Sequence, residues 1–121
     1  ENDFMKTHHQ LGLDSNQLTS IPKTFKNLTK LKCLNLGMND LGNSSFDKSI
    51  WSGLTHLVTL SIFGNRLTDL PENLTACIRL ESIYAGYNNI LGLHQTPTRN
   101  HLLYHLNTHI RHLHNLQQLH L

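Results

Sequence analysis

The sequence predicts an α/β solenoid in which about five short parallel strands form one curved sheet. The main observation is an eleven-residue pattern of leucines and one asparagine that recurs along the chain. Its best copy is LVTLSIFGNRL at 57–67, and close copies are LKCLNLGMNDL at 31–41 and LESIYAGYNNI at 80–90. Less complete copies are HHQLGLDSNQL at 8–18 and LQQLHL at 116–121. Five copies in 121 residues indicate one repeated structural unit.

The apolar residues within each copy alternate as they do in a strand with one buried face. In the best copy, Leu60 and Ile62 alternate with the polar residues Thr59 and Ser61. A single strand of this length cannot bury its apolar face by itself. Successive copies must therefore stack side by side into a continuous parallel sheet.

An asparagine follows the strand in each of the four complete copies. We call these residues the asparagine ladder, and they are Asn16, Asn39, Asn65 and Asn88. The chain turns out of the strand there, which leaves backbone N–H and C=O groups inside the coil without partners. A side-chain amide can both donate and accept hydrogen bonds, whereas an aspartate can only accept them. We therefore expect the asparagine ladder to be structural.

The pattern L-x-x-L-x-L-x-x-N-x-L resembles the leucine-rich repeat over nearly the whole chain. The segments SIPKTFKNLTKL at 20–31 and DLPENLTACIRL at 69–80 are similar to the return segments of the L-P-x-x-L-x-x-L subclass. The resemblance implies a right-handed β-α superhelix with short helices or irregular turns outside the sheet. Repeats of this subclass occur in many cytoplasmic scaffold and signalling proteins, which implies protein–protein interaction. The resemblance to this subclass also favours a cytoplasmic location, and it leaves an extracellular location open.

The chain is expected to form one repeat domain at 8–121 after a polar lead-in at 1–7. The repeats are expected at 8–30, 31–56, 57–79 and 80–115, with the start of a fifth at 116–121. The fourth repeat contains an insertion at about 94–109, and insertions in solenoids are often used for binding. Neither end has a recognisable cap, so we expect flanking repeats of the same chain.

Composition excludes several classes of function. A formal net charge of +2 is too small to favour nucleic acid or an acidic membrane surface. No apolar run approaches the ~20 residues of a transmembrane helix, so no membrane insertion is predicted. Cys33 is expected on the outer side of the sheet and Cys77 in the core, as free thiols that favour an intracellular location. Neither a catalytic motif nor a cofactor motif occurs, so the sequence predicts neither an enzyme nor a cofactor.

The residues beside the strand leucines are expected to form the concave surface of the solenoid. The residues expected to bind a partner are Asn35, Met38, Thr59, Ser61, Phe63, Ser82, Tyr84, Tyr87 and Gln118. Four of these form an apolar ladder, namely Met38, Phe63, Tyr84 and Tyr87. Aromatic and methionine side chains on a rigid sheet are good anchors at protein interfaces. The predicted function is recognition of a protein partner, although the same residues could merely cover the strand ends.

Histidine is unusually frequent near the C-terminus, where seven of the ten histidines lie from His94 onward. His101, His105, His109 and His112 would share one arc of a helix. Histidines four residues apart can bind zinc, copper or nickel, but no carboxylate lies at 94–121 to orient their rings. No metal site is therefore assigned. A metal- or pH-responsive module on the helix at 101–112 stays open as an alternative. So does a role as targeting arm of a catalytic domain elsewhere.

Overall fold

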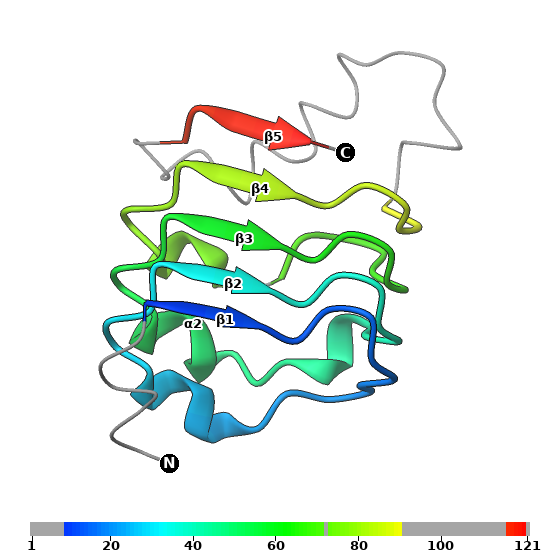
Figure 1. Ribbon diagram of the computed structural model, residues 1–121, viewed down its shortest axis with the longest axis horizontal. Helices are drawn as coiled ribbons and strands as arrows, with labels where there is room; N and C mark the ends of the chain where they lie inside the picture. Colours follow the sequence, from blue (N-terminus) through cyan, green and yellow to red (C-terminus); the bar gives the residue numbers. More distant parts are fainter. Residues whose placement is uncertain (1–8, 72, 91–115, 121) are drawn as a thin grey trace.

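In the computed structural model, the chain winds into stacked turns with a five-stranded parallel sheet along one side (Figure 1). The structure describes residues 9–71, 73–90 and 116–120. The strands are β1 (Gln10–Gly12), β2 (Cys33–Asn35), β3 (Thr59–Ser61), β4 (Ser82–Tyr84) and β5 (Gln118–His120). They lie in sequence order, and each pairs in parallel with the next. The prediction of an α/β solenoid with about five parallel strands is confirmed.

The strand register aligns the repeats residue by residue. One column faces the core and consists of Leu11, Leu34, Leu60, Ile83 and Leu119. The columns on either side of it face outward. The first consists of Gln10, Cys33, Thr59, Ser82 and Gln118, and the second of Gly12, Asn35, Ser61, Tyr84 and His120. Because side chains alternate along a strand, this register buries the leucines and presents the two other columns to water.

Short helices cover the side of the core opposite the sheet. They are the 3₁₀ helices η1 (Lys23–Asn27), η2 (Asn43–Ser45) and η3 (Leu74–Ala76), and the α-helix α2 (Ser49–Gly53). Pro22 precedes η1 in an extended conformation, as its fixed φ angle permits. The longer second repeat supplies α2, whose Ile50 and Trp51 are both buried.

Helix α2 packs so closely on η1 that no side chain fits at Gly53. A Cβ atom on Gly53 would lie 2.0 Å from the backbone oxygen of Lys26 and 2.6 Å from its carbonyl carbon. The second repeat therefore depends on a glycine at the end of α2 to approach the first repeat.

The two cysteines are free thiols and lie on opposite sides of the sheet, as expected. Cys33 is half-buried on the outer side, and Cys77 is buried in the core. Burial raises the pKa of the Cys77 thiol to about 12, so this thiol stays protonated at neutral pH.

Several sequence predictions fall outside the described residues. These are the lead-in at 1–7, the insertion at about 94–109, and the histidine helix with His101, His105, His109 and His112. Within the described part of the chain, none of the helices has the length and apolarity needed to span a membrane.

Candidate partner-binding surface

The asparagine ladder fixes the turns that follow the strands. The Asn65 amide nitrogen donates to the carbonyls of Ile62 and Phe63 in its own turn, at 3.0 and 3.3 Å. It also donates to the Leu36 carbonyl of the preceding repeat at 3.0 Å. The Asn65 side-chain oxygen accepts the Leu41 N–H, again from the preceding repeat, at 3.0 Å. One amide thus satisfies four backbone groups and joins two repeats.

Asn39 and Asn88 make the same connections one repeat before and one repeat after Asn65. Each donates to two carbonyls of its own turn and to one carbonyl of the preceding repeat. Their side-chain oxygens accept N–H groups of the preceding repeat, including that of Leu67 for Asn88. Asn16 is exposed and donates within its own turn, to Leu13 and Asp14.

The residue before each asparagine adopts a left-handed backbone conformation. The φ angles are 58° at Ser15, 55° at Met38, 69° at Gly64 and 52° at Tyr87. A side chain larger than glycine costs of order 1 kcal/mol there. The turn nevertheless carries Met38 and Tyr87, and both side chains are exposed, Met38 by 53% and Tyr87 by 82%.

Three large side chains meet just beyond the strand ends, and we call Met38, Phe63 and Tyr87 the rim cluster. The rings of Phe63 and Tyr87 lie edge to face, with centroids 5.0 Å apart. Met38 belongs to the repeat before Phe63, and its side chain occupies the space above Gly64. A Cβ atom on Gly64 would lie 2.4 Å from the Met38 sulfur. The rim cluster therefore brings large apolar side chains of three successive repeats to one end of the strands.

The order of glycine and large residue explains how the rim cluster interlocks. The second and fourth repeats read Gly37-Met38 and Gly86-Tyr87, whereas the third reads Phe63-Gly64. Phe63 therefore stands in the column of the two glycines, and Gly64 leaves space for the side chain of Met38 in the preceding repeat. The sequence identified the three side chains, and the reversed order of glycine and large residue in the third repeat is visible when the three copies are aligned.

A stacked pair of rings stands beside the rim cluster on the last two strands. Tyr84 of β4 and His120 of β5 have ring centroids 4.6 Å apart and planes only 3° from parallel. Tyr84 was a predicted partner-binding residue, whereas His120 was expected only as one of the residues beside a strand leucine on the concave surface. The repeat register pairs these two positions directly.

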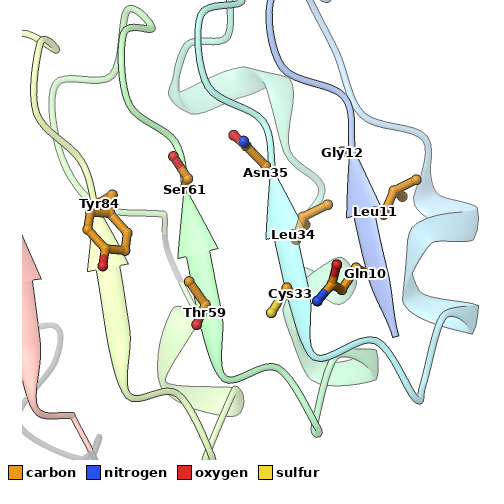
Figure 2. A pocket seen from close by; sticks show the side chains of 9 residues that line it. All are labelled: Gln10, Leu11, Gly12, Cys33, Leu34, Asn35, Thr59, Ser61 and Tyr84. Carbon is orange, nitrogen blue, oxygen red and sulfur yellow. The ribbon is translucent and has the colours of Figure 1, made fainter. Parts of the chain in front are cut away.

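The outer face of the sheet is hollowed over β1, β2 and β3, and we call this hollow of about 330 Å³ the concave recess (Figure 2). Tyr84 borders it on β4. The other residues that line it are Gln10, Leu11, Gly12, Cys33, Leu34, Asn35, Thr59 and Ser61. Of the predicted residues, Asn35, Thr59, Ser61 and Tyr84 line the concave recess, and the rim cluster lies outside its lining. Ser82 and Gln118 do not line it. Gln10, Gly12 and Cys33 were expected beside the strand leucines on the concave surface, but not among the partner-binding residues.

The chemistry of this face suits binding by shape and neutral contacts. The described residues that line the concave recess carry no formal charge at neutral pH, and the rim cluster is apolar. Among the described residues, no three histidine, cysteine or carboxylate side chains lie close enough to hold a metal ion. The residues that can act here are hydrogen-bonding amides and hydroxyls next to aromatic and thioether surfaces.

Comparison with known proteins identifies the family. The leucine-rich repeat family model matches residues 9–67. The chain is 33% identical to keratocan of Bos taurus over 69% of its own length and 24% of that protein. It is 34% identical to osteomodulin of Bos taurus, over 78% of this chain and 22% of that protein. The chain thus spans about a quarter of the length of these curated relatives.

A third relative differs in kind. An adenylate cyclase of Schizosaccharomyces pombe (strain 972 / ATCC 24843) is 34% identical over 75% of this chain, which corresponds to 5% of that protein.

The relatives leave the cellular location open. Keratocan and osteomodulin are secreted proteins of the extracellular matrix, so the comparisons do not confirm the predicted cytoplasmic location or a signalling role. The repeated frame, the parallel sheet in register and the family match agree with one another. Together they show that this chain is a leucine-rich repeat protein.

Proposed function

We propose that this chain binds a protein partner through the concave face of its solenoid and acts as a scaffold without catalysis of its own. The family and the relatives support a protein-interaction module in general. The choice of the concave face rests on the rim cluster. The division into a lead-in at 1–7 and one repeat domain at 8–121 is part of this proposal.

The observation that carries the proposal is the exposure of three large apolar side chains on successive repeats, two of which have their rings in contact. Water covers Met38 and Tyr87 over more than half of their surfaces, and Phe63 over 36%. Each Å² of apolar surface removed from water by a partner contributes about 25 cal/mol, so this patch favours association. Met38 and Tyr87 also adopt a left-handed backbone conformation, which is strained for a residue with a side chain. A glycine at either position would relieve this strain.

The sheet beneath these residues limits the entropic cost of binding. Phe63 and Tyr87 follow β3 and β4, and Asn65 and Asn88 tie these two turns to the preceding repeats through hydrogen bonds. The backbone is therefore ordered before a partner arrives, and association need not immobilise it. Aromatic side chains held in this way are typical of the residues that dominate the energy of an interface.

Combined replacement of Phe63, Tyr84 and Tyr87 by alanine is expected to reduce partner binding at least tenfold. Each of the three side chains is 36% exposed or more, so their loss should leave the core intact. The measurement is a pull-down from extracts of the source cells, with the circular dichroism spectrum as a check on the fold.

Ile78 supplies the matched control for this experiment. It is a large apolar residue, 60% exposed, that follows η3 on the side of the solenoid away from the sheet. Ile78→Ala should leave partner recovery unchanged. A partner that the triple variant retains and Ile78→Ala loses would move the site to the convex side and refute the proposal.

A further inference from the structure

The second outward-facing column of the sheet carries small residues on β1, β2 and β3 and aromatic rings on β4 and β5. It begins with Gly12, which has no side chain, continues with the small polar residues Asn35 and Ser61, and ends with the rings of Tyr84 and His120. The Tyr84 ring therefore stands beside the smaller residues of β1, β2 and β3 (Figure 2), and the His120 ring stacks on Tyr84. Gly12 contributes no side chain to the lining of the concave recess.

Gly12 is not required by the backbone. A Cβ atom at this position would meet only an oxygen of the Asp14 carboxylate, at 3.6 Å, which is ordinary van der Waals contact. The φ angle of Gly12 lies outside the left-handed region. Among the glycines of the described residues, it is Gly64 that adopts a left-handed conformation. The fold would accept a larger residue in β1, so the space above Gly12 is available for a ligand.

The electrostatics of the concave recess disfavour acidic groups. The described residues that line it include no lysine or arginine, and the Asp14 carboxylate lies next to its β1 end. Among the described residues, Asp14 forms no ion pair. A carboxylate that entered would lose its water without gaining a cation, and it would be repelled by Asp14.

The same hollow offers unused hydrogen-bonding capacity. Within the described part of the chain, the side chains of Gln10, Thr59 and Ser61 have no protein partner. The Asn35 side-chain oxygen accepts the Gly37 N–H at 2.9 Å, which leaves the Asn35 amide hydrogens free. These groups can satisfy the backbone amides and neutral polar side chains of a polypeptide.

We propose that the concave recess receives a short extended segment of the protein partner that carries no acidic side chain. The proposal rests on the proposed function, because this segment belongs to the partner that the rim cluster holds. A polypeptide fits better than a sugar chain because Met38, Phe63 and Tyr87 provide apolar surface just beyond the strand ends. Such surface matches aliphatic and aromatic side chains. The volume of about 330 Å³ lies at the lower end for ligand sites, which suits part of a peptide.

The test uses the full 121-residue chain and a phage-displayed library of random twelve-residue peptides as the probe. Enriched sequences are synthesised, and their affinities are measured for the wild type and for Gly12→Val. Valine favours strands and fills the hollow, so binding should weaken at least tenfold. Ile78→Val, which introduces the same residue on the side of the solenoid away from the sheet, is the control and should bind as the wild type does. Should Gly12→Val fail to fold by circular dichroism, Ser61→Phe fills the hollow from β3 instead.

The exclusion of acidic groups has its own readout. Aspartate placed at the peptide position that is most sensitive to Gly12→Val should weaken binding at least tenfold. Asp14→Asn should restore part of this loss, because it removes the repelling carboxylate. Enrichment of acidic peptides, an absence of enriched peptides, or an affinity for Gly12→Val within twofold of the wild type would each overturn the proposal.

Two further arms separate this proposal from the proposed function. If the Phe63, Tyr84, Tyr87 triple alanine loses the peptides while Gly12→Val keeps them, the concave face binds and the assignment of the recess fails. If neither variant weakens binding, both proposals fail. Binding to an array of neutral oligosaccharides that Gly12→Val abolishes would assign the recess to a glycan and overturn the peptide assignment.

Discussion

Replacement of Asn65 by aspartate is expected to lower the free energy of unfolding by about 3 kcal/mol or more. The Asn65 amide nitrogen donates to three carbonyls, and its side chain is only 8% exposed. An aspartate has no hydrogen to donate, so these carbonyls would lose a donor and face a carboxylate. Each buried group left unsatisfied costs about 1–3 kcal/mol, and a charge costs more. Urea unfolding followed by circular dichroism measures the change.

Asn16→Asp is the matched control for this prediction. Asn16 holds the same position in the first repeat, but it is exposed and donates to two carbonyls of its own turn. Water can replace those bonds, so the loss should stay below about 1 kcal/mol. Equal losses for the two variants would mean that burial and the bonds to the preceding repeat contribute little, which would contradict the structural role of the ladder.

Replacement of Gly53 by alanine is expected to destabilise the protein by about 2 kcal/mol or more. Alanine normally stabilises a helix relative to glycine by roughly 0.5–1 kcal/mol. Here the added methyl group would lie 2.0 Å from the Lys26 backbone oxygen, which cannot move without displacing η1. Overpacking of this kind typically costs about 1–3 kcal/mol. Thermal unfolding of the variant and the wild type shows directly whether the substitution raises or lowers the stability of the protein.

Gly42→Ala is the corresponding control. A Cβ atom on Gly42 would meet nothing closer than 3.9 Å, the nearest atom being in the Arg66 guanidinium group. Its φ angle of −110° suits any residue, so we expect little change in the melting temperature. A Gly53→Ala variant that melts with or above the wild type would show that α2 and η1 can separate at no cost.

The strands and their register were predictable because they depend on a local pattern that repeats. The alternation around Leu34 and Leu60 fixes which side chains face inward, and stacking then aligns equivalent residues. The ring pair of Tyr84 and His120 follows from the same register, although the two residues belong to distant segments of the chain. Strand positions can be derived wherever one face of a strand must be buried.

The contacts that depend on differences between repeats were not predictable. The fit of Gly53 against Lys26 arises from α2, which belongs to the longer second repeat and has no counterpart in the consensus. The concave recess likewise depends on an absent side chain at Gly12 and on a wall at Tyr84 three repeats later. A pattern that averages over repeats loses this information, because it records what the copies share.

The asparagine ladder has a direction, and this direction bears on how such an array can grow. In Asn39, Asn65 and Asn88 the amide reaches back to the preceding repeat, so each unit carries the connector for the joint at its own beginning. Duplication of a single segment therefore supplies a new strand together with the group that fastens it. The outward-facing residues take no part in that fastening. Substitutions on the binding surface can therefore change the partner without affecting the joints between repeats. The number of repeats can likewise change without altering the binding surface of the existing repeats.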